Sequence, residues 1–179
     1  MESTLSAADF SPSDPTTGPI VAKPIVAMMC GLPGSGKTRL ARKLEAELDA
    51  VRFDVDSWMI ALFGRHMPRE QLHHRLGTLK DLMWESGRRV VELGGNLVID
   101  FGFWKRAERG EFAKRIAEAG GEPVLYFLDT PLDLLRERLA ERNRNLPAGT
   151  YEVTPEMLAM FAGWFETPIS DEGLRIIKP

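Results

Sequence analysis

The feature that most constrains the fold of this chain is a glycine-rich octapeptide that lies between an apolar run and a helical pattern. The pattern G-x-x-x-x-G-K-[ST] is matched by Gly31-Leu32-Pro33-Gly34-Ser35-Gly36-Lys37-Thr38. The six residues before it, Ile25–Cys30, are apolar and have the length of a strand buried on both faces. After it, leucines recur every four residues at Leu40, Leu44 and Leu48, which indicates an amphipathic helix. This context favours a phosphate-binding loop over a glycine-rich turn that matches by chance.

The chemistry of such a loop comes mainly from its backbone. Glycines let successive N–H groups point inward, and the helix N-terminus adds partial positive charge, so that the loop forms a cradle for anions. The pattern predicts that Lys37 reaches the β- and γ-phosphates of ATP and that the Thr38 hydroxyl ligates Mg²⁺. We therefore expect ATP and Mg²⁺ as cofactors, bound by residues 31–38.

Size and composition are those of one soluble domain. The chain has 179 residues, of which 44% are hydrophobic and 27% charged, within the ordinary range for a globular protein. No apolar run approaches the ~20 residues of a membrane span, and the N-terminus lacks the pattern of a secretion signal. We expect a cytoplasmic protein with a mobile leader at residues 1–23 and one folded domain at residues 24–179.

Net charge bears on nucleic-acid binding, and cysteine content bears on whether the chain has a reactive thiol. The net charge of −3 provides no overall attraction for nucleic acid, so we do not expect a nucleic-acid partner, although a local basic groove stays open as an alternative. The single cysteine, Cys30, is expected to be a small core residue and not a reactive thiol. Nothing in the sequence indicates the oligomeric state.

An acidic residue follows a second predicted strand. Residues 51–53 are expected to form the strand and residues 58–63 a helix, which places Asp56 where a helix N-cap belongs. A carboxylate at this edge of a parallel sheet could instead accept the proton of an attacking hydroxyl. Spacing alone favours the cap. Asp54, two residues upstream, is a weaker candidate for the base.

A second carboxylate ends the third predicted strand, at residues 96–102. Leu97, Val98 and Ile99 lead to Asp100, and an aspartate is uncommon in a buried strand because an unpaired charge there is costly. In nucleotide-binding α/β proteins such an aspartate helps to hold Mg²⁺. The aromatic residues that follow Asp100 are more often core than pocket, but one of them could stack on a substrate together with Trp58.

Two further helices carry basic residues. A long helix from Pro68 to the glycines at 94–95 has a basic, histidine-rich beginning, which could cover a substrate pocket but is more often a solvated face. Residues 123–128 are expected to form a strand, and Thr130 to cap the next helix. On that helix Arg138 and Arg142 share a face. They could pair with nearby glutamates, but their position before the loop at 143–150 favours a phosphate-binding lid around residues 143–155.

Strand and helix patterns alternate about five times, which predicts an α/β fold with a parallel sheet covered on both faces. The segments GLPGSGKT, FDVDSWMIALFG, VIDFGFWKR and RERLAERNRNLP together resemble the small P-loop kinases that include chloramphenicol phosphotransferase, zeta toxins and the kinase domain of phage polynucleotide kinase. The resemblance covers roughly residues 25–168. It implies a P-loop NTPase three-layer sandwich whose five parallel strands have the order 2-3-1-4-5.

The resemblance also assigns roles to residues. It implies that Asp56 is the general base, which reverses the interpretation from spacing alone, and that Arg138 and Arg142 are lid arginines. We therefore expect an ATP-dependent phosphotransferase acting on a hydroxyl of a small molecule that is antibiotic-like, a sugar or of nucleoside type. The alternatives are a 5′-hydroxyl polynucleotide kinase, a zeta-toxin-like nucleotide-sugar kinase, and an ATP-binding switch or assembly factor without an acceptor. Residues 65–89 and the segment DFGFW match no substrate-binding motif of the family, so the acceptor stays undefined.

Overall fold

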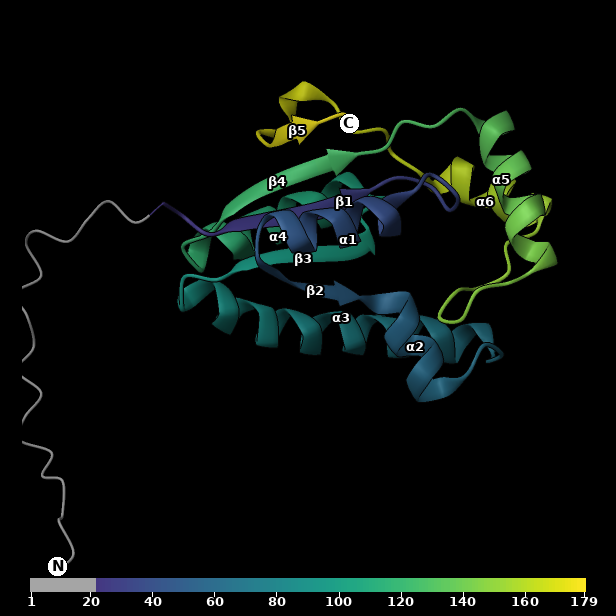
Figure 1. Ribbon diagram of the computed structural model, residues 1–179, viewed down its shortest axis with the longest axis horizontal. Helices are drawn as coiled ribbons and strands as arrows, with labels where there is room; N and C mark the ends of the chain where they lie inside the picture. Colours follow the sequence, from purple (N-terminus) through teal and green to yellow (C-terminus); the bar gives the residue numbers. More distant parts are fainter. Residues whose placement is uncertain (1–21) are drawn as a thin grey trace, which may run out of the picture.

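A computed structural model of the chain describes residues 22–179; most of the predicted leader at residues 1–23 lies outside this range. The described chain forms one parallel sheet of five strands (Figure 1), in the order β2-β3-β1-β4-β5. The order confirms the predicted 2-3-1-4-5. The strands are β1 (Ile25–Cys30), β2 (Ala50–Asp54), β3 (Asn96–Gly102), β4 (Glu122–Phe127) and β5 (Arg175–Ile177).

Six α-helices connect and flank these strands. They are α1 (Lys37–Glu47), α2 (Val55–Phe63), α3 (Arg69–Glu92), α4 (Arg106–Glu118), α5 (Leu132–Arg144) and α6 (Pro155–Trp164). None of the helices in the described part of the chain is long and apolar enough to cross a membrane.

Two of the predicted helix starts were wrong. Helix α2 begins three residues before the predicted start, because Asp54 and not Asp56 is its N-cap and accepts a hydrogen bond of 3.1 Å from the Ser57 backbone N–H. Helix α5 begins after Pro131 and has no side-chain cap, so Thr130 does not have the predicted role. The shift at α2 moves Asp56 from the cap into the first helical turn, where its carboxylate is free for another use.

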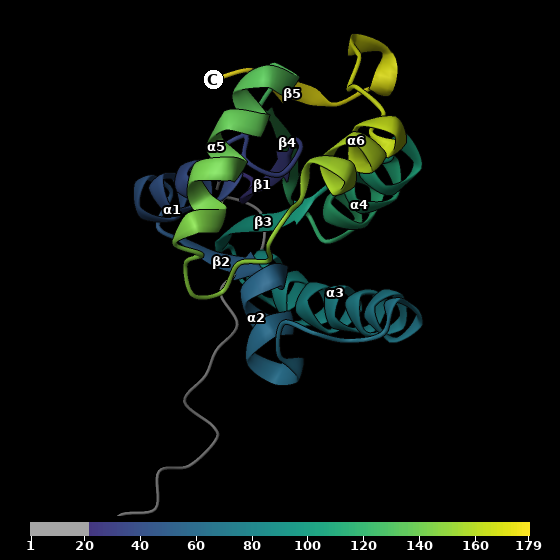
Figure 2. The same ribbon diagram turned by 90° about the vertical axis from the view of Figure 1, so that its right-hand side faces the viewer.

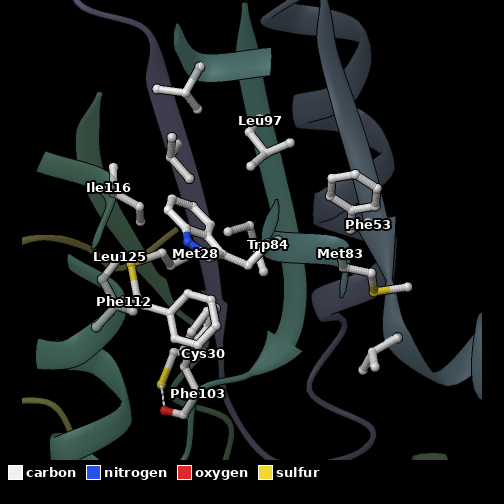
Figure 3. Close-up of a cluster of buried hydrophobic side chains, with 14 of the residues drawn as sticks. Met28, Cys30, Phe53, Met83, Trp84, Leu97, Phe103, Phe112, Ile116 and Leu125 are labelled. Carbon is white, nitrogen blue, oxygen red and sulfur yellow. Dashed lines mark hydrogen bonds between the residues drawn. The ribbon is translucent and has the colours of Figure 1, made fainter. Parts of the chain in front are cut away.

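The helices form a layer on each face of the sheet (Figures 1 and 2). Alternate residues of β1 enter two separate cores because successive side chains of a strand point to opposite faces. Met28 packs with residues of α3 and α4 in the main core, whereas Met29 packs with residues of α1 in a smaller one. Figure 3 shows the main core around Trp84 and Phe112.

Cys30 is part of the main core, as predicted. Its thiol is fully buried and donates to the Phe103 carbonyl at 3.3 Å, a contact drawn in Figure 3. Burial raises the pKa of this thiol to about 12, so the thiolate that would react is not formed near neutral pH.

Helices α5 and α6 lie beyond the carboxyl ends of the strands, beside the phosphate loop. They form a third core through Leu135, Leu139 and Leu158. The loop between them passes over the start of α2 (Figure 2). Gly149 of this loop lies so close to α2 that a Cβ atom there would be 2.8 Å from the Ser57 hydroxyl, and the Arg65 side chain donates to the Pro147 carbonyl at 3.1 Å. The loop therefore closes one side of the carboxyl edge of the sheet.

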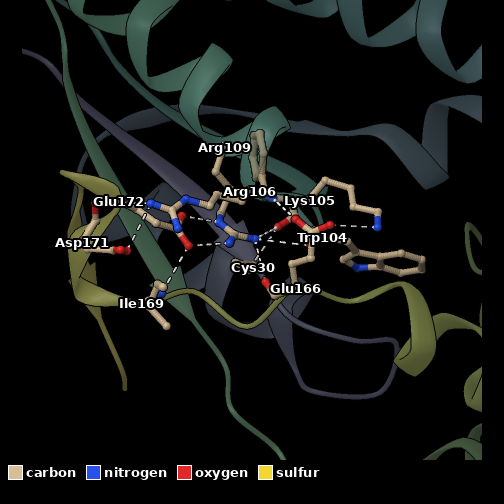
Figure 4. Close-up of polar contacts among 10 residues, drawn as sticks. Cys30, Trp104, Lys105, Arg106, Arg109, Glu166, Ile169, Asp171 and Glu172 are labelled. Atoms are coloured by element: carbon tan, nitrogen blue, oxygen red, sulfur yellow. Dashed lines mark hydrogen bonds and ion pairs between the residues drawn. The ribbon is translucent and has the colours of Figure 1, made fainter.

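A buried ion pair attaches the C-terminal segment to α4. Arg109 donates to both carboxylate oxygens of Glu172 at 2.5 and 2.6 Å (Figure 4), and these side chains are only 1% and 3% exposed. The same guanidinium donates to the carbonyls of Phe103, Trp104 and Glu166. Phe103 has a positive φ of 43°, an uncommon conformation for a bulky residue, and the contact with Arg109 helps to hold it.

Replacing Glu172 with alanine should lower the free energy of unfolding by about 3 kcal/mol, because it leaves a buried guanidinium without its counterion. We expect the lower end of the range for buried pairs because this pair lies just beneath the surface. The control is Glu111→Ala, which removes an exposed pair with Arg115 on α4 and should cost no more than about 0.5 kcal/mol. Urea denaturation measures both values, and equal losses would contradict the anchoring role of Arg109.

Candidate active site

The phosphate loop lies between β1 and α1 and has the backbone that its glycines were expected to allow. Gly34 and Gly36 have φ values of 83° and 98°, and Gly36 is the N-cap of α1. Residues with a side chain rarely adopt this left-handed conformation. A Cβ atom at Gly34 would also lie 3.1 Å from Leu139, so α5 packs directly on the loop. The sequence Gly34-Ser35-Gly36 is thus required both by the curl of the loop and by the approach of α5.

Lys37 begins α1 and turns back onto the loop. Its Nζ donates to the Leu32 carbonyl at 2.9 Å. Burial lowers the pKa of this ammonium group, while the carboxylates of Asp100 and Asp56 act in the opposite direction. Lys37 therefore lies between the loop and the two carboxylates that the sequence singled out, in a position from which a triphosphate held by the loop can be reached.

Thr38 and Asp100 meet although 62 residues separate them. The Thr38 hydroxyl donates to a carboxylate oxygen of Asp100 at 2.8 Å, because β3 pairs with β1 and ends beside the start of α1. Burial raises the pKa of Asp100, opposed by Lys37 and by the Thr38 hydrogen bond. A hydroxyl and a carboxylate are hard oxygen ligands of the kind that Mg²⁺ prefers, so the residues present fit this ion.

Asp56 faces the same region from the first turn of α2. Its side chain is exposed to solvent and makes no hydrogen bond or ion pair with residues 22–179. The protein around this carboxylate removes part of its water, and this desolvation raises the pKa of Asp56 to about 6; Lys37 lowers the pKa, and Asp100 and Asp54 raise it further. Asp54, by contrast, is buried, and its carboxylate accepts hydrogen bonds from the Arg52 side chain at 3.1 Å and from the Ser57 hydroxyl at 2.7 Å. Of the two, Asp56 has the free carboxylate.

The two arginines predicted on the lid helix lie in different surroundings. Arg138 donates to the Gly34 carbonyl at 3.4 Å and lines an open cavity of about 660 Å³ with Arg39 and Lys43, on the outer side of the phosphate loop. Arg142 is half-buried and donates to the Tyr151 carbonyl at 3.1 Å. Burial lowers the pKa of Arg142, and the charge of Asp56 opposes the shift, which places Arg142 on the side of Asp56.

Ion pairing along α5 does not use these two residues. The pairs within the helix join Arg136 to Asp133 and Arg144 to Glu141. Neither Arg138 nor Arg142 has a carboxylate partner among the described residues. The alternative that they serve as surface ion pairs is therefore not supported, and both guanidinium groups are available to phosphate oxygens.

Sequence reasoning missed the residues that brace the site. The Trp104 indole N–H donates to the Gly31 carbonyl at 3.0 Å, so this residue helps to hold the phosphate loop. Phe103 is fully buried in the main core. Tyr151, which no motif singled out, lies in the loop that covers the start of α2. Trp58 keeps the exposure expected of a stacking group, at 46%, in edge-to-face contact with Phe53.

Comparison with protein families identifies the fold. A family model described as an AAA domain matches residues 26–168, most of the chain. The chain belongs to this AAA domain family. No curated protein matches it.

Solved structures show how widely the fold of this AAA domain is shared. A presumed kinase from Chloroflexus aurantiacus superposes with a TM-score of 0.69 and 18% identity, covering 88% of each chain. Kti12 of Chaetomium thermophilum in complex with ADP-AlF3 has a TM-score of 0.63 and 17% identity, covering 86% of this chain and 88% of its own. A sugar kinase from a Janibacter species has a TM-score of 0.59 and 20% identity, covering 87% and 84%. At these identities the likeness establishes the P-loop kinase-like fold, and not an activity.

Proposed function

We propose that the protein is an ATP-dependent phosphotransferase that moves the γ-phosphate to a hydroxyl of a small molecule. The observation that carries the proposal is the free carboxylate of Asp56, with its pKa raised to about 6, beside Lys37 at the carboxyl edge of the sheet. A general base works best when its pKa lies near the operating pH.

In this mechanism the loop amides of residues 31–38 and Lys37 hold the β- and γ-phosphates. Thr38 and Asp100 would hold Mg²⁺, which when bound neutralises charge on the phosphate oxygens. Asp56 accepts the proton of the acceptor hydroxyl while the oxygen of that hydroxyl bonds to the γ-phosphorus. The bond from that phosphorus to the bridging oxygen breaks, and ADP leaves.

The two arginines take separate roles in this proposal. Arg142, on the side of Asp56, stabilises negative charge on the transferring group. Arg138 lines the cavity outside the loop with Arg39 and Lys43, where the α-phosphate and nucleoside of ATP would lie. The proposed lid is the segment around residues 143–155, because its loop already rests against Ser57 and must move for an acceptor to enter.

ADP release in the presence of candidate acceptors tests the proposal. The panel contains D-gluconate, xylitol, adenosine, chloramphenicol, a nucleotide sugar and a 5′-hydroxyl oligonucleotide. We expect one of the small compounds to increase ADP release by about 10-fold or more and to appear phosphorylated by phosphorus NMR, and Lys37→Met to abolish the increase. Slow ADP release that no compound changes would contradict the proposal and favour an ATP-binding switch.

One observation favours a second candidate, a 5′-hydroxyl polynucleotide kinase. Trp58 is exposed on α2, and at the end of the same helix the centre of the Phe63 ring lies 4.4 Å from the guanidinium of Arg75 on α3. Aromatic and basic groups together are typical of surfaces that bind single strands. This candidate requires oligonucleotide binding that weakens steeply as salt is raised, together with oligonucleotide-stimulated ADP release.

A further inference from the structure

Unpartnered polar atoms gather at the candidate active site. Among residues 22–179, the buried side-chain nitrogen and oxygen atoms without a hydrogen-bond partner are Ser35 Oγ, Arg142 Nε and the Tyr151 hydroxyl. Buried polar groups are nearly always paired, because losing water without gaining a partner is costly. Ser35 belongs to the phosphate loop. The other two atoms belong to Arg142 and Tyr151, and the Arg142 side chain donates a hydrogen bond to the Tyr151 backbone carbonyl. The phosphoryl transfer proposed above assigns no role to the Tyr151 hydroxyl.

Tyr151 lies on the same side of the site as the proposed base. Its carbonyl accepts a hydrogen bond from Arg142 at 3.1 Å. Two residues earlier, Gly149 packs against Ser57, the residue that follows Asp56. The Tyr151 ring is half-buried against the main core. Burial raises the pKa of the Tyr151 phenol, and Asp56 is the charged group that raises it further.

The geometry points to Tyr151 as a specificity-determining residue whose hydroxyl binds an oxygen of the acceptor other than the one that is phosphorylated, with Arg142 Nε as a second donor to the acceptor. The inference rests on the proposed function and deepens it. The acceptor class that it implies is a polyhydroxyl compound or hydroxy acid, and not a molecule with a single hydroxyl on an apolar frame.

The class follows from hydrogen-bonding capacity. A phenol can donate or accept, whereas a guanidinium N–H can only donate. Hydroxyl or carboxylate oxygens of an acceptor can therefore satisfy each of the two orphaned groups. An apolar group in the same place would leave both buried and unpaired, which is the arrangement by which binding sites reject analogues that lack an oxygen.

The variant Tyr151→Phe tests the inference first without any acceptor. Removing an unpartnered buried hydroxyl should leave the unfolding temperature unchanged or raise it by about 2–4 °C. A hydroxyl with a structural partner would lower it instead. Tyr126→Phe is the matched control, because Tyr126 lies on β4 and packs with residues of α1, away from the lid.

Kinetics with polyhydroxyl probes test it directly. For whichever of D-gluconate and xylitol gives the larger stimulation of wild-type ADP release, Tyr151→Phe should raise the acceptor KM about 3- to 10-fold and leave the KM for ATP unchanged. Deoxy analogues of that probe, each lacking one non-reacting hydroxyl, complete the test. One of them should lose affinity for the wild type but bind the variant as well as the parent probe does.

The outcomes separate the two proposals. If no compound of the full acceptor panel stimulates the wild type, the proposed function fails and this inference fails with it. If a probe stimulates the wild type and Tyr151→Phe leaves its KM unchanged, the inference alone is overturned. A fall of several degrees in the unfolding temperature of Tyr151→Phe, without such a fall for Tyr126→Phe, also overturns it.

Discussion

Asp56→Asn should lower turnover by about 100- to 10,000-fold while ATP still binds. The amide keeps the shape of the side chain but cannot accept the acceptor proton, and a positioned base contributes about this factor. The phosphate loop and Lys37 are unchanged, so affinity for ATP should be kept. Steady-state ADP release with the stimulating acceptor gives turnover, and equilibrium titration with a fluorescent ATP analogue gives binding.

The pH dependence of kcat/KM is a second test of Asp56 as the general base. Asp56 acts only when deprotonated, and its pKa is raised to about 6. Wild-type kcat/KM should therefore be constant above pH 7 and fall about tenfold per unit well below pH 6. The residual kcat/KM of Asp56→Asn should not show this fall at acidic pH.

Asp54→Asn is the matched control for Asp56. The two aspartates lie two residues apart, but Asp54 caps α2 and pairs with Arg52. Asparagine can still cap the helix, so Asp54→Asn should lose mainly the ion pair, at a cost of about 1 kcal/mol of stability, and keep most of the turnover. Near-normal turnover of Asp56→Asn with retained ATP binding would rule out its role as the base. A larger loss of turnover in Asp54→Asn would assign that role to Asp54.

Arg142→Met should lower kcat by about 1,000-fold with little change in the KM for ATP. An arginine that contacts the transferring phosphoryl group stabilises charge that develops mainly in the transition state, and losses of this size are typical. Methionine keeps the apolar stem of the half-buried side chain, so packing at the end of α5 is largely preserved. A melting curve of the variant checks that the hydrogen bond to the Tyr151 carbonyl is not needed for folding.

Arg138→Met is the comparison, one helical turn away. Because Arg138 lies outside the loop and lines the cavity with Arg39, its loss should mainly raise the KM for ATP, by about 10-fold, and affect kcat less. We therefore expect Arg142→Met to act mainly on kcat and Arg138→Met to act mainly on the KM for ATP. Equal effects of the two variants, or the reverse split, would contradict the separate roles assigned to these arginines.

Local pattern was sufficient for most of the architecture. The strand before the phosphate loop and the strand ending in Gly102 have the predicted bounds, because a buried parallel strand is a continuous apolar run with sharp limits. The residues Thr38 and Asp100 could be expected together because parallel strands end at the same edge of a sheet. The strand order came from resemblance to a family and not from any periodicity.

What the tertiary structure alone decided were contacts between distant parts of the chain. Spacing could not tell whether Asp54 or Asp56 caps α2, since both are acceptable caps and the choice depends on Arg52 and on where β2 ends. It could not separate Arg138 from Arg142, which share a helix face but meet different partners at the phosphate loop and the lid. The buried pair of Arg109 and Glu172 joins residues 63 apart. Helix and strand periods report which face of an element is buried, whereas the partner of a polar side chain is set by the packing of elements that the local sequence does not encode.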